Sequence, residues 1–305
     1  MQTATPEATS ALRGIETALA RALTELPALS PLLEAFGPLL AEQARLRQAA
    51  PGWTGPAIAV DPDRFTQGAF VLAHTQVGGG FEDMSAQLPA AARALLPVMA
   101  KSFPALAKEF SALGKAIKSG ALSPQDLAAT GFGEMRPVVP GVSAETLAFA
   151  AAELVRPFVE RQAQDLLALV RELPWRQTCC PVCGGAPNMS ALRRVNEDDA
   201  FIQAHGGRRF LRCSCCATEW THKRVSCPGC GCEEPDELVV LRDPARQHER
   251  ADACKRCKSF ILCLDTGELA DTPDPDIAAL TMLPLAIQAK EQGFTPLAEH
   301  PWSNL

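Results

Sequence analysis

The sequence predicts an α+β protein, with a mostly helical N-terminal domain, two small cysteine-rich modules and a C-terminal helix. Leucine and alanine recur at three- and four-residue spacing through the first half of the chain. Tyrosine is absent, and a chain rich in Ala and Leu suits helices better than sheets. All 12 cysteines lie between residues 175 and 265, where glycine and arginine are also frequent. This shift in composition separates the helical part from the cysteine-rich part.

The length of 305 residues favours two domains or more. We expect a helical domain over residues 1–173 and a tandem cysteine-rich domain over 174–265, divided into 174–222 and 223–265. A linker and helix then occupy 266–305. Segments at the N-terminus carry the helical spacing, prolines fall near their breaks and three glycines mark a loop. The expected helices are Thr9–Leu26, Leu32–Ala49 and one or two within Met84–Lys118, interrupted near Ser102–Pro104.

The clearest long helical pattern runs over Ser143–Glu172. Ser143 can cap its first turn, and Pro174 closes it. Pro157 lies inside this segment and is expected to kink or split the helix, because proline lacks the N–H that the helix needs. We interpret its broad apolar stripe as core packing, with a groove for a partner as the alternative.

Short β-type stretches appear in the cysteine-rich part, each leading toward or away from a cysteine pair. They are Arg209–Arg212, Leu238–Leu241 and Phe260–Leu262. After a proline-rich stretch, Asp276–Gln292 is typical of a final amphipathic helix, with Gly293 as its stop signal.

Four Cys-x-x-Cys pairs carry the strongest chemical signal. A two-residue gap lets both sulfurs of a tight knuckle bind one ion, and two knuckles complete a tetrahedron around zinc or iron. Two of the knuckles have the form Cys-Pro-x-Cys-Gly, which occurs in both rubredoxins and zinc ribbons and does not select the metal. The predicted ligands of two metal ions, iron or zinc, are Cys180, Cys183, Cys213, Cys216, Cys227, Cys230, Cys254 and Cys257.

Consecutive pairing puts the first four of these cysteines in one site and the last four in the other. An interleaved arrangement, in which the first pair meets the third, is the alternative. Four cysteines are left over and are interpreted as partly buried spectator thiols, with ligand exchange or redox sensing as the alternative. They are Cys179, Cys215, Cys232 and Cys263.

His205 and His222 lie nearby, but eight cysteines already fill two sites. The carboxylate neighbours Glu82/Asp83 and Asp198/Asp199 are interpreted as solvated loops rather than an acid/base pair.

Charge and targeting signals limit the function classes. The net charge is −6, and the segment from Trp175 to Asp265 has 14 basic against 12 acidic residues. Two four-thiolate sites would add about −4, so binding to nucleic acid is a poor fit. The opposing hypothesis is a basic strip made of Arg193, Arg194, Arg208, Arg209 and Arg212.

The polar segment Met1–Ser10 has no secretory signal pattern, and no apolar run is long enough for a membrane span. We therefore expect a cytoplasmic protein with reduced cysteines.

Several runs in the cysteine-rich part resemble the FdhE family, the formate dehydrogenase accessory (formation) proteins. The matching runs are Cys180–Gly184, Arg209–Trp220, Arg224–Cys227 and Arg250–Cys257, together with Gln292–Phe294 after the closing helix. The specific motifs cover only about residues 175–265, and the helical half resembles the family in character. Two departures are notable: Phe260 and Leu262 stand where the family usually has Tyr and then Lys, and Cys215 is an extra cysteine.

The resemblance implies a maturation factor rather than an enzyme. Such a factor would bind the immature catalytic subunit of formate dehydrogenase and would bind iron in rubredoxin-like fashion through the paired cysteines. Glu219–Trp220 is a candidate contact, because an exposed tryptophan is a frequent interface anchor; burial of Trp220 between the ribbons is the alternative. The competing functional hypotheses are a rubredoxin-like redox protein acting on that client and a zinc-ribbon nucleic-acid-binding protein.

Overall fold

The computed structural model describes residues 6–75, 80–194, 207–267, 269 and 273–300. The chain divides into two compact units. The first contains the residues up to 55 together with 81–165, and the second contains 56–80 together with 166–300. A stretch from the N-terminal half thus belongs to the same unit as the cysteines, and each unit is described by itself.

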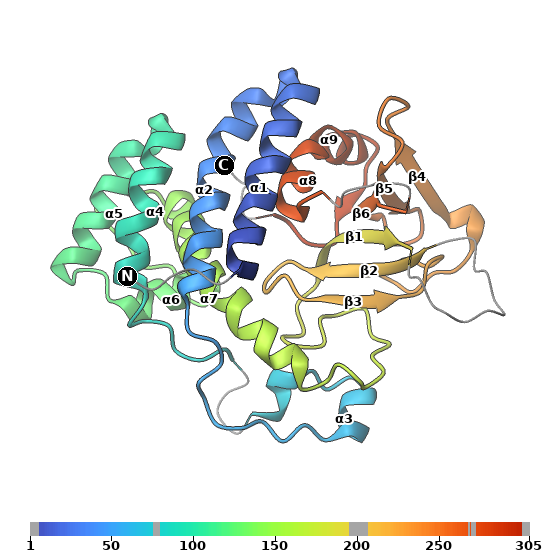
Figure 1. The fold of residues 1–305 in the computed structure, drawn as a ribbon, viewed down its shortest axis with the longest axis horizontal. Helices are drawn as coiled ribbons and strands as arrows, with labels where there is room; N and C mark the ends of the chain where they lie inside the picture. The colour runs from blue at the N-terminus through green and yellow to red at the C-terminus, as the bar shows by residue number, and fades with distance from the viewer. Residues whose placement is uncertain (1–5, 76–79, 195–206, 268, 270–272, 301–305) are drawn as a thin grey trace. The chain divides into compact units, whose positions relative to one another are not determined.

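The first unit is helical, as the leucine and alanine spacing predicts (Figure 1). Its helices are α1 (Pro6–Glu25), α2 (Ser30–Ala49), α4 (Leu88–Ser102), α5 (Ala107–Ser119), α6 (Pro124–Gly131) and α7 (Ala144–Ala168), the last up to residue 165. The predicted break between α4 and α5 is confirmed. Phe103 lies at this break and packs its ring against Phe36, Phe110 and Phe149. The core of the unit is made of leucines with no exposed surface, among them Leu33, Leu95, Leu113 and Leu154.

Helix α7 begins as predicted, because the Ser143 hydroxyl accepts a hydrogen bond from the Thr146 N–H at 3.2 Å. The predicted split at Pro157 is wrong, because α7 continues through that residue. Proline leaves the carbonyl four residues earlier, that of Glu153, without its helical donor. The buried side chain of Gln43 on α2 replaces it, since Gln43 Nε2 lies 3.0 Å from the Glu153 carbonyl oxygen. A donor from a neighbouring helix thus makes an internal proline tolerable.

Replacing Gln43 by leucine is expected to lower the free energy of unfolding by about 2 kcal/mol, because it removes the buried hydrogen bond from Gln43 Nε2 to the Glu153 carbonyl. Chemical denaturation followed by far-UV circular dichroism measures this change. Pro157→Ala restores a helical N–H to the Glu153 carbonyl, so Gln43→Leu should cost less in the Pro157→Ala background. An equal cost in both backgrounds would show that Gln43 does not compensate for the proline.

The second unit is built on one mixed sheet with the strand order β3-β2-β1-β6-β5-β4, and β7 also pairs with β6. The strands are β1 (Pro187–Arg193), β2 (Arg208–Cys213), β3 (Glu219–His222), β4 (Leu238–Arg242), β5 (Glu249–Cys254), β6 (Ser259–Asp265) and β7 (Thr295–Pro296). The three predicted β stretches are therefore confirmed as parts of β2, β4 and β6. Strands β1–β3 and β4–β6 each form an antiparallel three-stranded ribbon.

The two ribbons join edge to edge through β1 and β6, which run parallel with Met189 opposite Leu262 and Leu192 opposite Asp265. Each ribbon has the chain order knuckle, strand, strand, knuckle, strand. The first strand of the first ribbon meets the third strand of the second, so the ribbons repeat head to tail within one sheet. The two modules of the sequence analysis are thus present, but they share a continuous backbone ladder.

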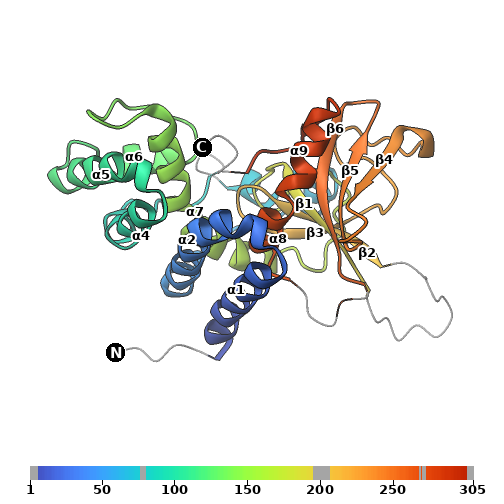
Figure 2. The same ribbon diagram turned by 90° about the horizontal axis from the view of Figure 1, so that it is seen from above.

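Two short helices, α8 (Pro275–Thr281) and α9 (Leu283–Glu291), follow the ribbons, and α9 packs beside β5 and β6 (Figure 2). They correct the prediction of one helix over Asp276–Gln292. Pro284 lies in the first turn of α9, where a missing N–H is tolerated, and its ring would clash with the carbonyl of a continuous preceding turn. Gly293 follows the helix with φ of 83°, which agrees with the predicted stop.

Candidate metal centres

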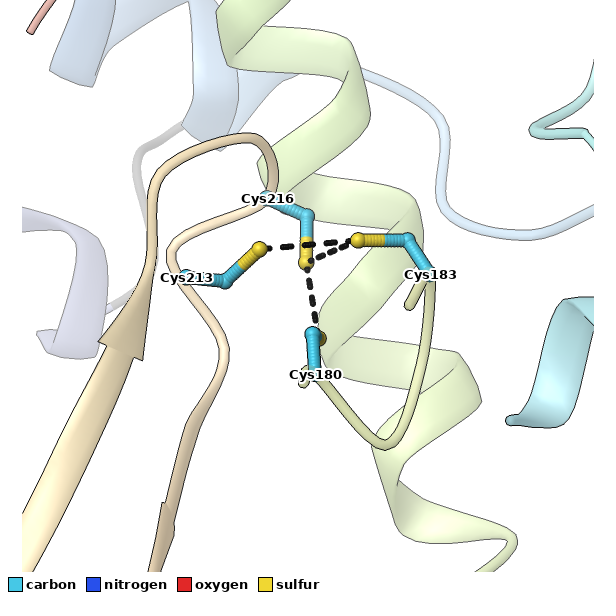
Figure 3. Close-up of side chains that lie close together, drawn as sticks. All are labelled: Cys180, Cys183, Cys213 and Cys216. Atoms are coloured by element: carbon cyan, nitrogen blue, oxygen red, sulfur yellow. Dashed lines mark hydrogen bonds between the residues drawn. The ribbon is translucent and has the colours of Figure 1, made fainter. Parts of the chain in front are cut away.

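The structure gathers the eight paired cysteines into two groups of four. Cys180, Cys183, Cys213 and Cys216 form the first group, which we call site 1 (Figure 3). Cys227, Cys230, Cys254 and Cys257 form the second, which we call site 2. The consecutive pairing is therefore the observed one, and the interleaved alternative is excluded. Each site takes its first two cysteines from a knuckle before a ribbon and its last two from the knuckle between the second and third strands.

The sulfur positions fit a tetrahedral ion. In site 1, the Cys180–Cys216, Cys183–Cys213 and Cys183–Cys216 sulfur pairs are 3.6, 3.5 and 3.5 Å apart (Figure 3). In site 2, the Cys227–Cys257 and Cys230–Cys254 sulfur pairs are 3.5 and 3.8 Å apart. Four sulfurs at about 2.3 Å from one zinc ion lie about 3.8 Å from each other. Either group could therefore hold an ion with little movement.

All four knuckles share one backbone turn. The residue after the second cysteine of each pair has a left-handed φ: Gly184 at 75°, Ala217 at 54°, Gly231 at 71° and Lys258 at 58°. Ala217 and Lys258 are the non-glycine residues with positive φ in the described part of the chain. A non-glycine residue adopts this conformation at a cost, which the surrounding structure must offset. Backbone strain in this fold therefore coincides with the cysteine turns.

Hydrogen-bond donors surround the sulfurs. The backbone N–H groups of Val182, Cys215 and Gly229 approach the Sγ atoms of Cys180, Cys213 and Cys227 at 3.4, 3.4 and 3.3 Å. Two hydroxyls occupy equivalent places in the two ribbons. Thr218 Oγ1 lies 3.1 Å from Cys216 Sγ, and Ser259 Oγ lies 2.9 Å from Cys257 Sγ. Such donors stabilise negative charge on a thiolate and would tune a bound metal.

The chemistry of the thiols also favours a cation. Burial raises the pKa values of Cys180 and Cys216 well above those of ordinary thiols. Without a cation these sulfurs would keep their protons. A divalent ion would displace those protons when it binds. At site 2, burial acts to raise the pKa of Cys257, but hydrogen bonds with Ser259, Cys227 and Cys230 together outweigh it and lower the pKa to about 7.

The two sites differ in their cover. The segment 56–75 packs onto the first knuckle, where the Val71 and Leu72 N–H groups donate to the carbonyls of Pro181 and Val182 at 2.8 and 3.0 Å. This segment contains the short helix α3 (Pro62–Thr66) and a 3₁₀ turn over Val71–His74. At site 1, Cys180, Cys213 and Cys216 are buried and Cys183 is half-buried. At site 2, Cys230 is exposed and Cys257 is at least partly exposed.

We expect metal to leave the loaded protein in two phases, with site 2 emptying first, because exposed sulfurs are open to a competing chelator. Stopped-flow mixing with a chromogenic chelator would resolve one equivalent of fast release and one of slow release. Cys230→Ser should remove the fast phase, and Cys180→Ser should remove the slow one. Release of both equivalents at one rate would contradict the difference in protection.

The leftover cysteines lie outside both groups. Cys215 is exposed, Cys179 is half-buried, and Cys232 and Cys263 are buried. Burial raises the pKa of Cys263 to about 11, which makes it a neutral thiol at physiological pH. His222 is not part of either cysteine group; its Nδ1 lies 3.1 Å from the Lys223 carbonyl. His205, Asp198 and Asp199 lie outside the described residues.

The residues predicted to contact a partner or nucleic acid make interactions within the protein. Trp220 is buried and its Nε1 donates to the Gln177 carbonyl at 3.3 Å, so the interpretation as an exposed anchor is wrong. Glu219 forms a two-pronged ion pair with Arg193 at 2.6 Å. Of the supposed basic strip, Arg209 and Arg212 are buried and pair with Asp252 and Asp276.

The carboxylates Glu82 and Asp83 serve the local backbone. Glu82 accepts hydrogen bonds from the N–H and hydroxyl of Thr54, and Asp83 accepts one from the Ser85 N–H at 2.9 Å. Hydrogen bonds from the Ser85 hydroxyl and N–H lower the pKa of Asp83.

Sequence reasoning overlooked Thr218 and Ser259 at the sites. The usable signal was their common position, two residues after the last cysteine of each site.

The class defined by this fold and these sites is a ribbon-type protein with two four-cysteine groups that could hold metal ions. Residues 179–224 match the family model described as FdhE, central domain. The chain is 30% identical over 154 residues to an FdhE homologue of Aquifex aeolicus, a match that covers 50% of this chain and 51% of the relative. It is 32% identical over 133 residues to an FdhE homologue of Rhizobium meliloti, covering 41% and 40%.

The chain therefore spans about half or less of the length of these curated relatives. The crystal structure of the FdhE protein from Pseudomonas aeruginosa superimposes with a TM-score of 0.52 at 21% identity, covering 95% of both chains. At that identity the likeness concerns the fold. The family model and the curated relatives are thus similar to part of this chain, and the crystal structure shares its fold. Within the described residues, the helices are too short or too polar to cross a membrane.

Proposed function

We propose that this chain is a cytoplasmic accessory factor in the maturation of formate dehydrogenase. It binds two metal ions, iron or zinc, through the eight paired cysteines and docks on the immature catalytic subunit. In this proposal it acts by binding and is not itself an enzyme. The observation that carries the proposal is the pair of four-cysteine groups in one FdhE-type sheet.

The donor set supports a binding role over metal-assisted hydrolysis. Four cysteine sulfurs complete a tetrahedron and leave no position for water or substrate, whereas catalytic zinc sites keep one position open. A bound ion would contribute folding energy to a small ribbon and would fix the surface next to it. The residues present thus suit a metal that shapes a docking surface.

A redox role is the second candidate, and the exposure of Cys230 at site 2 is the observation that favours it. Four-thiolate iron exchanges an electron without changing its ligands, and an accessible sulfur shortens the path to a client. The colour of anaerobically purified protein separates the metals, because ferric four-thiolate iron is red and zinc is colourless. Protein that contains only zinc and still supports maturation would rule out the redox role.

The test of the proposed function is an anaerobic pull-down from the native host with tagged protein. We expect the wild type to retrieve a formate dehydrogenase catalytic subunit. The Cys180→Ser/Cys183→Ser variant tests whether site 1 is required, and Cys215→Ser is the matched control because it removes a thiol outside both groups. Failure of the wild type to retrieve the subunit from cells that express it would contradict the proposal.

A further inference from the structure

The sheet of the second unit ends in a strand whose outer side has no partner strand in the described residues. This strand is β4, which pairs with β5 on its other side. Its counterpart in the first ribbon is β1, because both strands follow the first knuckle of their ribbon. The equivalent side of β1 is covered by β6 in a parallel pair. The same strand edge thus occurs twice in the described residues: on β1 it is paired with β6, and on β4 it has no partner strand.

The outward groups of β4 follow from its register with β5. The Glu237 carbonyl accepts a hydrogen bond from the Lys255 N–H at 2.8 Å. In an antiparallel ladder such bonded pairs recur at every second residue, so Val239 and Leu241 also bond to β5. The N–H and carbonyl groups of Leu238, Val240 and Arg242 therefore point to the open edge. An extended chain laid along β4 can bond to them as a strand in a sheet does.

An apolar groove runs beside this edge. A cavity of about 220 Å³ lies between the segment before the third knuckle and the face of β4, β5 and β6, and is lined among others by Val225, Leu238, Val240 and Ile261. Val225 is 60% exposed and Val240 is 48% exposed. Open backbone groups next to an apolar groove are the two parts of a β-strand recognition site, since the edge binds main chain and the groove takes alternate side chains.

The charges of the groove select the kind of segment. Its charged lining residues are Arg209, Arg224, Arg250 and Asp252. Asp252 pairs with Arg209 and with Arg250, at 3.0 and 2.8 Å, so outside the cysteines of site 2 one carboxylate faces three guanidinium groups in the lining. Arg209 is only 3% exposed, and its Nε atom has no hydrogen-bond partner. An acidic side chain entering the groove could bond to these guanidinium groups, among them the Nε atom of Arg209.

We propose that an extended segment of the client catalytic subunit, bearing acidic side chains, adds to the outer edge of β4 in the position that β6 takes on β1. This inference rests on the proposed function, because it assigns the surface by which the client is held. The knuckle of Cys227 forms one wall of the groove, so a metal ion at site 2 would keep the groove in shape.

Val240→Pro is the sharpest test. It removes one outward N–H, while proline is compatible with an edge strand whose N–H faces away from the sheet. Val240→Thr keeps the N–H and the branched shape and is the matched control. With purified client subunit in a titration, we expect Val240→Pro to weaken binding about tenfold and Val240→Thr to change it less than twofold. Circular dichroism and two bound metal equivalents must be unchanged in both variants.

Two further measurements keep the inference falsifiable if Val240→Pro does not fold. Arg224→Glu, an exposed change at the groove, should weaken client binding about fivefold, whereas the charge change Lys118→Glu on α5 should leave it unchanged. Hydrogen exchange on the wild type should slow at Leu238, Val240 and Arg242 when the client is added.

The outcomes separate the two proposals. A wild type that does not bind the client overturns both. A wild type that binds it, with Val240→Pro equally tight or with no added protection on β4, overturns the edge site and leaves the proposed function standing. A wild-type dimer that Val240→Pro disrupts would assign the edge to a second copy of the chain and would also overturn this inference.

Discussion

Replacing Cys180 and Cys183 together by serine is expected to reduce the bound metal from two equivalents to one and to unfold the first ribbon. The lost binding energy is large, since structural zinc contributes an apparent 10–16 kcal/mol, roughly, at neutral pH, whereas whole domains are stable by only about 5–15 kcal/mol. The knuckle also anchors backbone hydrogen bonds from Val71 and Leu72, which would lose their fixed partners. Most of the helix lies in the first unit and should remain.

Metal analysis, far-UV circular dichroism and hydrogen exchange together measure this result. We expect the amides of β1 and β2 to lose protection while those of α4 and α5 keep it. Cys215→Ser is the control, because Cys215 is exposed and belongs to neither group. Two metal equivalents in the double variant would overturn the assignment of these residues as ligands.

Replacing Arg209 by methionine is expected to lower the free energy of unfolding of the second unit by about 3–5 kcal/mol, because it removes a buried guanidinium that bonds both to Asp252 and to the Ser226 carbonyl. Arg209 lies on β2 of the first ribbon. Its guanidinium donates to the Ser226 carbonyl at 2.9 Å and to Asp252 on β5 of the second ribbon at 3.0 Å. Ser190 on β1 lies within 3.4 Å of the same group. One side chain thus connects the two ribbons across their shared edge.

Thermal unfolding of the metal-loaded protein tests this role. Arg209→Lys keeps the charge but cannot reach all three partners with a planar group, so it should recover only part of the loss. Arg208→Met, a change at the exposed neighbour, should alter stability by less than about 0.5 kcal/mol. If Arg209→Met and Arg208→Met cost the same, the link between the ribbons would not depend on this guanidinium.

The four cysteine knuckles could be predicted because the Cys-x-x-Cys spacing is a local feature of the sequence. A Cys-x-x-Cys turn and the strands beside it are set by neighbouring residues, so the knuckles and β2, β4 and β6 were recognisable. The fusion of the ribbons was not, since it depends on the pairing of β1 with β6, and β1 contains no β-branched residue. Pairing between distant strands leaves no local pattern to find.

The outcomes at Pro157 and Trp220 share a physical cause. The effect of a proline in a helix depends on whether another donor reaches the carbonyl that it leaves free, and here Gln43 does so from a distant helix. Whether a tryptophan is exposed depends on what packs over it, and Trp220 is buried with its indole N–H bonded to Gln177. Both outcomes are decided by residues far away in the sequence.

The segment 56–80 has a consequence for synthesis of the chain on the ribosome. It interrupts the residues of the helical unit, yet it packs with the cysteine-bearing unit. During translation it emerges well before the knuckle whose carbonyls accept the Val71 and Leu72 N–H groups. The covered form of site 1 can therefore be completed only after the later segment that contains the first knuckle has been synthesised. A C-terminal fragment made alone from residue 174 would lack that cover, and its first cysteine cluster would meet solvent and oxidants unprotected.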